Sequence, residues 1–170
     1  MKRNFGFTLV ELLVVISIIG FLSSIVLSNL RSARSKALNV QRVTEIKQIQ
    51  TALEYYYDKF GSYPATVSDV TASCGNWDTT TDGVFLPTLS TNGFFNSTLK
   101  DPADATCGNF AYYKYPAGFF RTGCPAERGA FYVLGVRNMD KGGFPTSPGF
   151  GCPTRDWQSE FDWVTGKYEN

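Results

Sequence analysis

A single carboxylate, Glu11, lies inside the most apolar stretch of this chain. Residues 7–30 read FTLVELLVVISIIGFLSSIVLSNL and hold no other charged side chain. A carboxylate in a bilayer is costly unless it finds a partner, so such a residue predicts a function. A cut after Gly6 would create one such partner, the free amine of Phe7, about one helical turn from Glu11. The two charges could pair within one chain or between neighbouring chains.

The apolar stretch around Glu11 is long enough to span a membrane. Its 24 residues extend roughly 36 Å as a helix, against about 30 Å for the hydrocarbon core. A soluble core helix rarely runs apolar on all faces over this length. A secretory signal peptide fits the basic Lys2 and Arg3, but its apolar region usually has only about 7–15 residues and ends at a small-residue cleavage site. Hydropathy alone therefore indicates a single-span anchor.

Four cysteines follow the apolar stretch: Cys74, Cys107, Cys124 and Cys152. An even number in a loop-rich segment indicates two disulfides and an oxidising compartment. Three pairings are possible, and we favour Cys74–Cys107 with Cys124–Cys152. Four thiolates could instead bind zinc, but such sites usually show closely spaced cysteine pairs, and the intervals here are 33, 17 and 28 residues.

Catalytic signatures are missing from the sequence. The 170 residues include no histidine, which excludes Ser-His-Asp and Cys-His mechanisms and histidine-ligated metals. No phosphate loop or nucleotide fingerprint occurs. We therefore expect a protein that is not an enzyme and has no cofactor or metal. The net charge of +1 gives no bias toward nucleic acid, so none is predicted as a partner.

The elements that would position these residues are one long helix and a small sheet. Apolar residues recur every three or four positions over 46–60, and Gly61 fits a C-cap, so we expect one helix from about Thr8 to Phe60. Residues 109–115 and 130–137 are rich in aromatic and β-branched residues and predict antiparallel strands. These elements predict an α+β fold in which the sheet packs on the second half of the helix.

Smaller features complete the secondary-structure prediction. A third strand is expected near 161–164, and a short helix or strand over 83–89. Trp157 and Trp163 are expected to pack in the core. The nearby carboxylates of Asp156, Glu160 and Asp162 are expected to form a solvated acidic surface.

Gly6-Phe7-Thr8-Leu9-Val10-Glu11, with the basic leader before it and the apolar helix after it, resembles the class III signal of type IV pilins and type II secretion pseudopilins. The resemblance covers residues 1–65 well. It implies cleavage between Gly6 and Phe7 by a prepilin peptidase and N-methylation of Phe7. It also implies that Glu11, with Thr8 beside it in the motif, acts in filament assembly.

On this basis the chain divides into four parts. Residues 1–6 would be the leader, 7–30 the transmembrane half of the helix, 31–60 its amphipathic half, and 61–170 a β-rich head with variable loops. The head lies outside the cytoplasm in such proteins. The resemblance places the subunit in the cytoplasmic (inner) membrane first, and then in a periplasmic or surface filament.

The implied function is structural: a subunit of a type IV pilus or a type II secretion pseudopilus. Its partners would be further copies, related pilins, the peptidase and an inner-membrane assembly platform. An alternative is a single-span, membrane-anchored extracytoplasmic binding domain that never polymerises. Residues 31–60 carry a net charge of +3 and the head −3, which suggests contacts between the stem of one subunit and the head of the next through Arg42 and Lys47.

A calcium site is a further implication of the resemblance. Major pseudopilins often bind calcium through acidic residues in a late loop, which here is 138–143 and holds one carboxylate, Asp140. Calcium takes about 6–8 oxygen ligands. We therefore expect a glycine-rich turn with a solvated Asp140, and a similar turn at Asp101 and Asp104.

Overall fold

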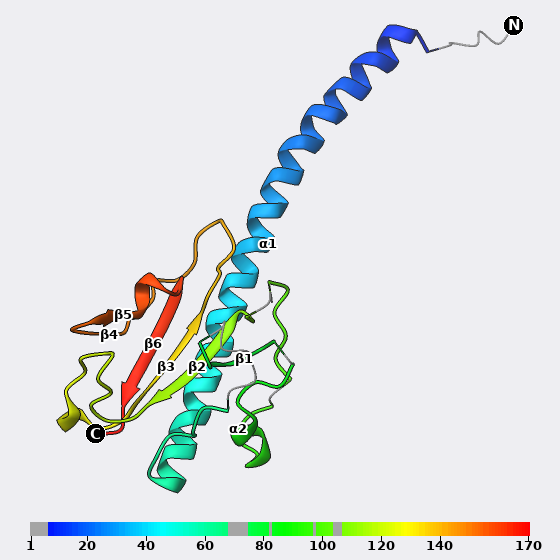
Figure 1. Ribbon diagram of the computed structural model, residues 1–170. Coiled ribbons are helices and arrows are strands. Elements are labelled where there is room, and N and C mark those ends of the chain that lie inside the picture. Colours follow the sequence, from blue (N-terminus) through cyan, green and yellow to red (C-terminus); the bar gives the residue numbers. More distant parts are fainter. Residues whose placement is uncertain (1–6, 68–74, 82, 97, 104–106) are drawn as a thin grey trace, which may run out of the picture.

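A single helix, α1 (Leu9–Phe60), forms the stem of the protein (Figure 1). It begins at the N-cap Thr8 and ends at Gly61, whose φ of 70° places it in the left-handed region that a C-cap requires. Its 52 residues extend about 78 Å without a break, which confirms the prediction of one helix. The computed structural model describes residues 7–67, 75–81, 83–96, 98–103 and 107–170.

The two halves of α1 lie in different surroundings. Residues 7–34 are exposed and project beyond the head (Figure 1). Within the described residues α1 is the one helix that is long and apolar enough to cross a membrane, and none of its apolar window is buried in the chain. In the second half, Ile46, Ile49 and Leu53 have no exposed surface. The first half therefore lacks a partner within the chain, whereas the second half has one.

The head is built on a four-stranded antiparallel sheet. Its order is β1 (Asp78–Thr79), β2 (Phe110–Tyr115), β3 (Phe131–Val136) and β6 (Trp163–Tyr168). Strands β2 and β3 confirm the two predictions. The third strand begins at Trp163 rather than 161, because the 3-10 turn η3 (Trp157–Ser159) precedes it.

The short elements lie in the connections between these strands. Helix α2 (Pro87–Thr91) falls within the segment predicted as helix or strand. A 3-10 turn, η2 (Ala126–Arg128), precedes β3, and a two-residue hairpin joins β4 (Gly151–Cys152) to β5 (Arg155–Asp156). Strands of two residues are too short to show a periodic pattern, so β1, β4 and β5 were not predicted.

The sheet buries side chains on both faces. Phe110, Tyr112 and Leu134 pack against α1. On the opposite face, Tyr115, Phe131, Val133 and Val164 pack with Trp157 under the loops. Alternate residues along each strand point to opposite faces, which divides the aromatic residues between the two layers. The α+β class and the buried positions of Trp157 and Trp163 agree with the sequence prediction.

Candidate functional site

Thr8 and Glu11 form a reciprocal cap at the start of α1. The Thr8 backbone N–H donates to Glu11 Oε2 at 2.8 Å, and the Thr8 hydroxyl donates to the same oxygen at 2.7 Å. In return, the Glu11 N–H donates to Thr8 Oγ1 at 3.2 Å. This capping box satisfies donors that a helix N-terminus otherwise leaves unpaired. It holds the carboxylate at the tip of the stem.

The other oxygen of Glu11, Oε1, accepts no hydrogen bond from the described residues. Phe7, one position before the cap, is 81% exposed. Gly6, the predicted last residue of the leader, lies outside the described residues. The arrangement therefore presents a carboxylate with one oxygen available at an exposed, apolar helix end.

A second charged site lies where the stem meets the head. Arg42, on α1, has only 2% of its surface exposed. Its Nε and Nη2 donate to the two carboxylate oxygens of Asp101 at 2.6 and 2.8 Å. Its Nη1 donates to Asp140 at 2.7 Å and to Asn39 at 2.9 Å. One guanidinium thus joins the stem to two head loops that lie far apart in the sequence.

Asn39 completes this junction through the backbone of the late loop. Its Nδ2 donates to the carbonyls of Asp140 and Gly143 at 2.8 and 3.3 Å, and its Oδ1 accepts the Asp140 N–H at 2.9 Å. Asn39 has no exposed surface. The polar side chains of Asn39, Arg42, Asp101 and Asp140 therefore all form hydrogen bonds, as a buried network requires.

Electrostatics at the junction favour the ionised form of Asp101. Burial raises the pKa of this carboxyl, but hydrogen bonds from Arg42 and from the Ala103 N–H outweigh it and hold the pKa below its ordinary value of 3.8. Glu45 lies nearby on α1, and burial raises its pKa. The Arg42–Asp101 pair therefore remains charged at neutral pH.

The junction changes three sequence-based expectations. Asp140 is not simply solvated but forms an ion pair with Arg42. Asp101 does form the expected turn, where it accepts the Ala103 N–H, but it is also a buried partner of Arg42. Asp104 lies outside the described residues. Arg42 is used within its own chain, so it is not available for the proposed contact between subunits. Lys47 is exposed and remains available.

A sequence signal for this junction existed. The buried positions Asn39, Arg42, Ile46, Ile49 and Leu53 follow one another at intervals of 3, 4, 3 and 4, which is a single helical stripe. The apolar residues that predict this half of the helix begin at Ile46. The same stripe continues toward the N-terminus to Arg42 and Asn39, two polar residues that need partners when they are buried.

The late loop does not fit a calcium ion. Its carboxylate, Asp140, already binds Arg42, and the carbonyls of Asp140 and Gly143 already accept from Asn39. Among the described residues, no three acidic, histidine or cysteine side chains gather where they could hold a metal. A calcium ion needs about 6–8 oxygens. Here the cation that links the loop to the stem is the guanidinium of Arg42.

Calcium is therefore expected to leave the stability of the head unchanged. Adding calcium ions or a chelator should shift the urea unfolding midpoint, followed by tryptophan fluorescence, by no more than the experimental error. Magnesium ions at the same ionic strength serve as the control for screening of surface charges. A calcium-specific rise in the midpoint would contradict this account.

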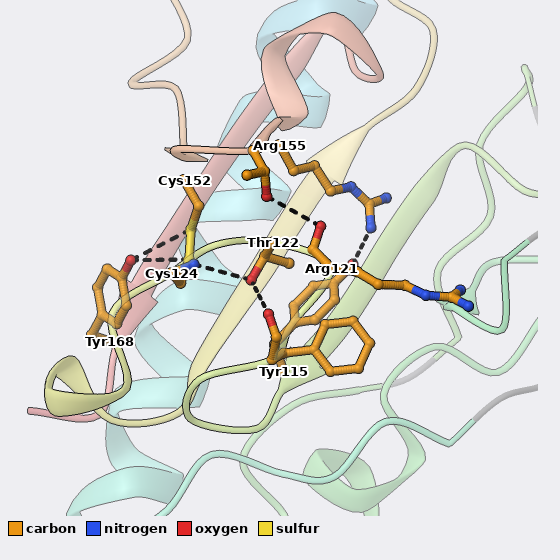
Figure 2. Close-up of a disulfide and its surroundings, with 9 residues drawn as sticks. Tyr115, Arg121, Thr122, Cys124, Cys152, Arg155 and Tyr168 are labelled. Atoms are coloured by element: carbon orange, nitrogen blue, oxygen red, sulfur yellow. Dashed lines mark hydrogen bonds between the residues drawn. A yellow bond between two sulfur atoms is a disulfide. The ribbon is translucent and has the colours of Figure 1, made fainter.

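One disulfide fastens the loops over the outer face of the sheet (Figure 2). It joins Cys124 to Cys152, whose Cα atoms lie 5.0 Å apart, and it is one of the two bridges of the favoured pairing. Tyr168 donates to Cys124 Sγ at 3.2 Å and lies 3.6 Å from Cys152 Sγ. None of the described cysteines is free, Cys107 included, whereas Cys74 lies outside the described residues.

The late carboxylates serve separate local roles. Glu160 binds Arg155 through both oxygens at 2.7 Å. Asp156 accepts the N–H of Gln158, and Asp162 accepts the N–H of Met139. They do not converge on a common point, so this acidic group forms no ligand site.

The prokaryotic N-terminal methylation motif matches residues 1–27. A type II secretion system core protein G of Escherichia coli is 33% identical over 130 residues, which cover 76% of this chain and 78% of that protein. The corresponding protein of Aeromonas hydrophila is 40% identical over 65 residues, 38% of this chain and 46% of that protein.

A more distant relative is the type IV major pilin protein PilA of Myxococcus xanthus. It is 29% identical over 68 residues, covering 40% of this chain and 31% of that protein. The chain thus spans less than half the length of several of the relatives it matches. No solved structure matches the chain significantly.

Proposed function

Since this chain belongs to the family of type IV pilins and type II secretion pseudopilins, we propose that it is cleaved after Gly6, methylated at Phe7 and assembled into a helical filament. The exposed first half of α1 would form the filament core, and a peptidase and a membrane platform would act on the subunit. Relatives named as core proteins of type II secretion favour a pseudopilus over a pilus. The subunit would enter the filament from the inner membrane, with its head outside the cytoplasm.

The observation that carries this proposal is the unpartnered stem. An apolar helix of more than 20 residues, none of which is buried within the chain, is stable only in lipid or against other apolar helices. Neighbouring stems provide such contacts, and head-to-tail association continues into a filament when the rotation does not close. Glu11 at the tip of the stem supplies a charge that a neighbour's Phe7 amine would neutralise.

Mass spectrometry of the N-terminus tests the proposal directly. Protein isolated from cells that carry the prepilin peptidase is expected to begin with methylated Phe7. An intact Met1 in those cells would contradict the proposal and support the alternative, an anchored binding domain that does not polymerise.

Replacing Glu11 by glutamine is expected to reduce filament yield by an order of magnitude or more, while insertion and cleavage continue. Glutamine retains an oxygen that can accept from Thr8, so the helix cap is largely kept, but the negative charge is lost. Sheared filaments quantified by immunoblot give the measurement. Asp58→Asn, an exposed carboxylate on the same helix, is the control, and equal loss in both variants would remove the charge-pairing argument.

A further inference from the structure

A pocket of about 390 Å³ lies on the sheet face that turns away from α1. Its volume falls in the range of about 300–1,000 Å³ that small-ligand sites occupy. Neither the stem nor the junction at Arg42 contributes to it. We call it the outer-face pocket, and its principal lining residues are Trp77, Tyr113, Tyr115, Phe119, Arg121 and Arg155.

Four aromatic rings form a continuous wall of this pocket. Tyr113 and Tyr115 project to the same face of β2 because side chains alternate along a strand. The Tyr113 ring lies 5.5 Å from Trp77 and 4.5 Å from Tyr115, and the Tyr115 ring lies 5.5 Å from Phe119, measured between centroids. Tyr113 and Phe119 are only half-buried. These two rings, whose faces carry a partial negative potential, keep part of their surface exposed at the pocket, whereas Trp77 and Tyr115 are only 4% and 3% exposed behind them.

The two arginines differ in how their charge is balanced. Arg155 binds both oxygens of Glu160 and donates from Nη1 to the Tyr115 hydroxyl at 3.0 Å. Arg121 is exposed and forms no ion pair with any described residue. Figure 2 shows both guanidinium groups extending to the same side, away from the disulfide. The Arg121 guanidinium lies 5.4 Å from the centroid of the Phe120 ring, so the pocket presents beside its aromatic wall one positive charge that no carboxylate of the described residues balances.

The backbone at one edge of the pocket is unusual. Gly75 and Asn76 are consecutive residues with φ of 79° and 58°, and both line the pocket. A non-glycine residue in this region is uncommon, and such residues concentrate at functional sites. Asn76 is exposed, and its amide offers both hydrogen-bond donors and an acceptor at the pocket edge.

We propose that the outer-face pocket binds a saccharide ring that carries a carboxylate, such as a uronic acid unit of an acidic polysaccharide. The C–H groups of the ring lie on the aromatic wall, where their partial positive charge meets the negative ring faces. The carboxylate accepts two hydrogen bonds from Arg121, the residue type suited to that geometry. The sugar hydroxyls exchange hydrogen bonds with Asn76 and with the Tyr113 hydroxyl.

Other anionic ligands match the pocket less well. A free phosphate would leave the aromatic wall unused. A nucleic acid needs a basic groove that follows several phosphates, whereas this pocket has one unbalanced cation on a head with a net charge of −3. A filament built on the stems, as proposed above, would turn this sheet face outward. Binding itself requires neither cleavage nor assembly.

The test uses the full chain in detergent micelles, so its outcome is independent of filament formation. Trigalacturonate is titrated by calorimetry and by tryptophan fluorescence, since Trp77 lines the pocket. We expect saturable binding of trigalacturonate with a dissociation constant below about 10 mM. This constant should be at least tenfold smaller than that of maltotriose, a neutral trisaccharide. Equal binding of the neutral sugar, no binding of either, or tighter binding of oligothymidylate would overturn the proposal.

Two substitutions, with one control, distinguish the contribution of the arginine from that of the aromatic wall. Arg121→Gln removes an exposed side chain with no ion pair among the described residues, so the fold is retained, and the affinity for trigalacturonate is expected to fall about tenfold or more. Arg128→Gln changes the charge of the head equally but does not line this pocket, and it should bind as the native chain does. Tyr113→Leu is expected to lower the affinity for both trigalacturonate and maltotriose. Unchanged affinity in Arg121→Gln would overturn the proposal.

Discussion

Replacing Gly6 by alanine is expected to leave the six-residue leader attached to nearly all of the protein. The family resemblance implies that the peptidase cuts directly after Gly6, a residue without a side chain. The methyl group of alanine would therefore occupy space beside the scissile bond and displace that bond in the peptidase. A misplacement of about 1 Å at a reacting bond is enough to cost a hundredfold in rate. The intact mass of membrane-extracted protein gives the measurement.

Gly20→Ala is the matched control for this variant. Gly20 lies in the exposed half of α1, and a Cβ built there meets no atom within 4 Å. The substitution also favours a helix by roughly 1 kcal/mol. It should be cleaved as the native chain is. Normal loss of the leader mass in Gly6→Ala would refute the assignment of residues 1–6 as a prepilin leader.

Replacing Arg42 by methionine is expected to lower the free energy of unfolding of the head by about 3–5 kcal/mol. Methionine fills much of the same volume but donates no hydrogen bond. It leaves Asp101, which is 8% exposed, as a buried carboxylate without its cation. It also releases Asp140 and the late loop from the stem. Urea unfolding of the full chain in micelles, followed by tryptophan fluorescence, measures the change.

Two controls distinguish the junction from a general loss of charge. Lys47→Met removes an exposed cation from the same helix and should change the free energy of unfolding by no more than about 0.5 kcal/mol. Adding Asp101→Asn to Arg42→Met removes the buried negative charge that has lost its cation. The double variant should therefore recover a large part of the lost free energy of unfolding. Similar losses in Arg42→Met and Lys47→Met would contradict the role of the junction.

Acid should lower the stability that the Arg42–Asp101 pair contributes, because protonation removes the charge of Asp101. The pKa of Asp101 is lowered in the folded protein, so its contribution to stability is present above its ordinary pKa and is lost as the pH falls through the folded value. In Arg42→Met, burial without the guanidinium raises that pKa, and protonation relieves the stranded charge. The difference between the two proteins should therefore begin to shrink as the pH falls through the raised pKa of Asp101 in the variant, and should go on shrinking until the lowered pKa in the native chain is passed.

The stem and the main strands of the head could be predicted from the sequence because their patterns are local. A run of 24 residues with one charge, uninterrupted helix-compatible residues as far as Gly61, and alternating aromatic strands each follow from spacing over a few positions. The N-terminal motif likewise occupies consecutive residues. Such features need no knowledge of which distant segments meet.

The Arg42 junction and the outer-face pocket depend on contacts between distant segments. Arg42 lies 59 residues from Asp101 and 98 from Asp140, so a charge count over residues 31–60 treated it as part of a basic surface. Strand β1, two residues long, places Trp77 next to β2 only through pairing with Tyr112 and Ala111. The sequence alone determined that the chain carries an apolar stem with a carboxylate near its tip and a head that holds all four cysteines. The tertiary structure alone decided which charges are neutralised internally and which remain for a partner, because burial and pairing arise from packing between segments that periodicity does not relate.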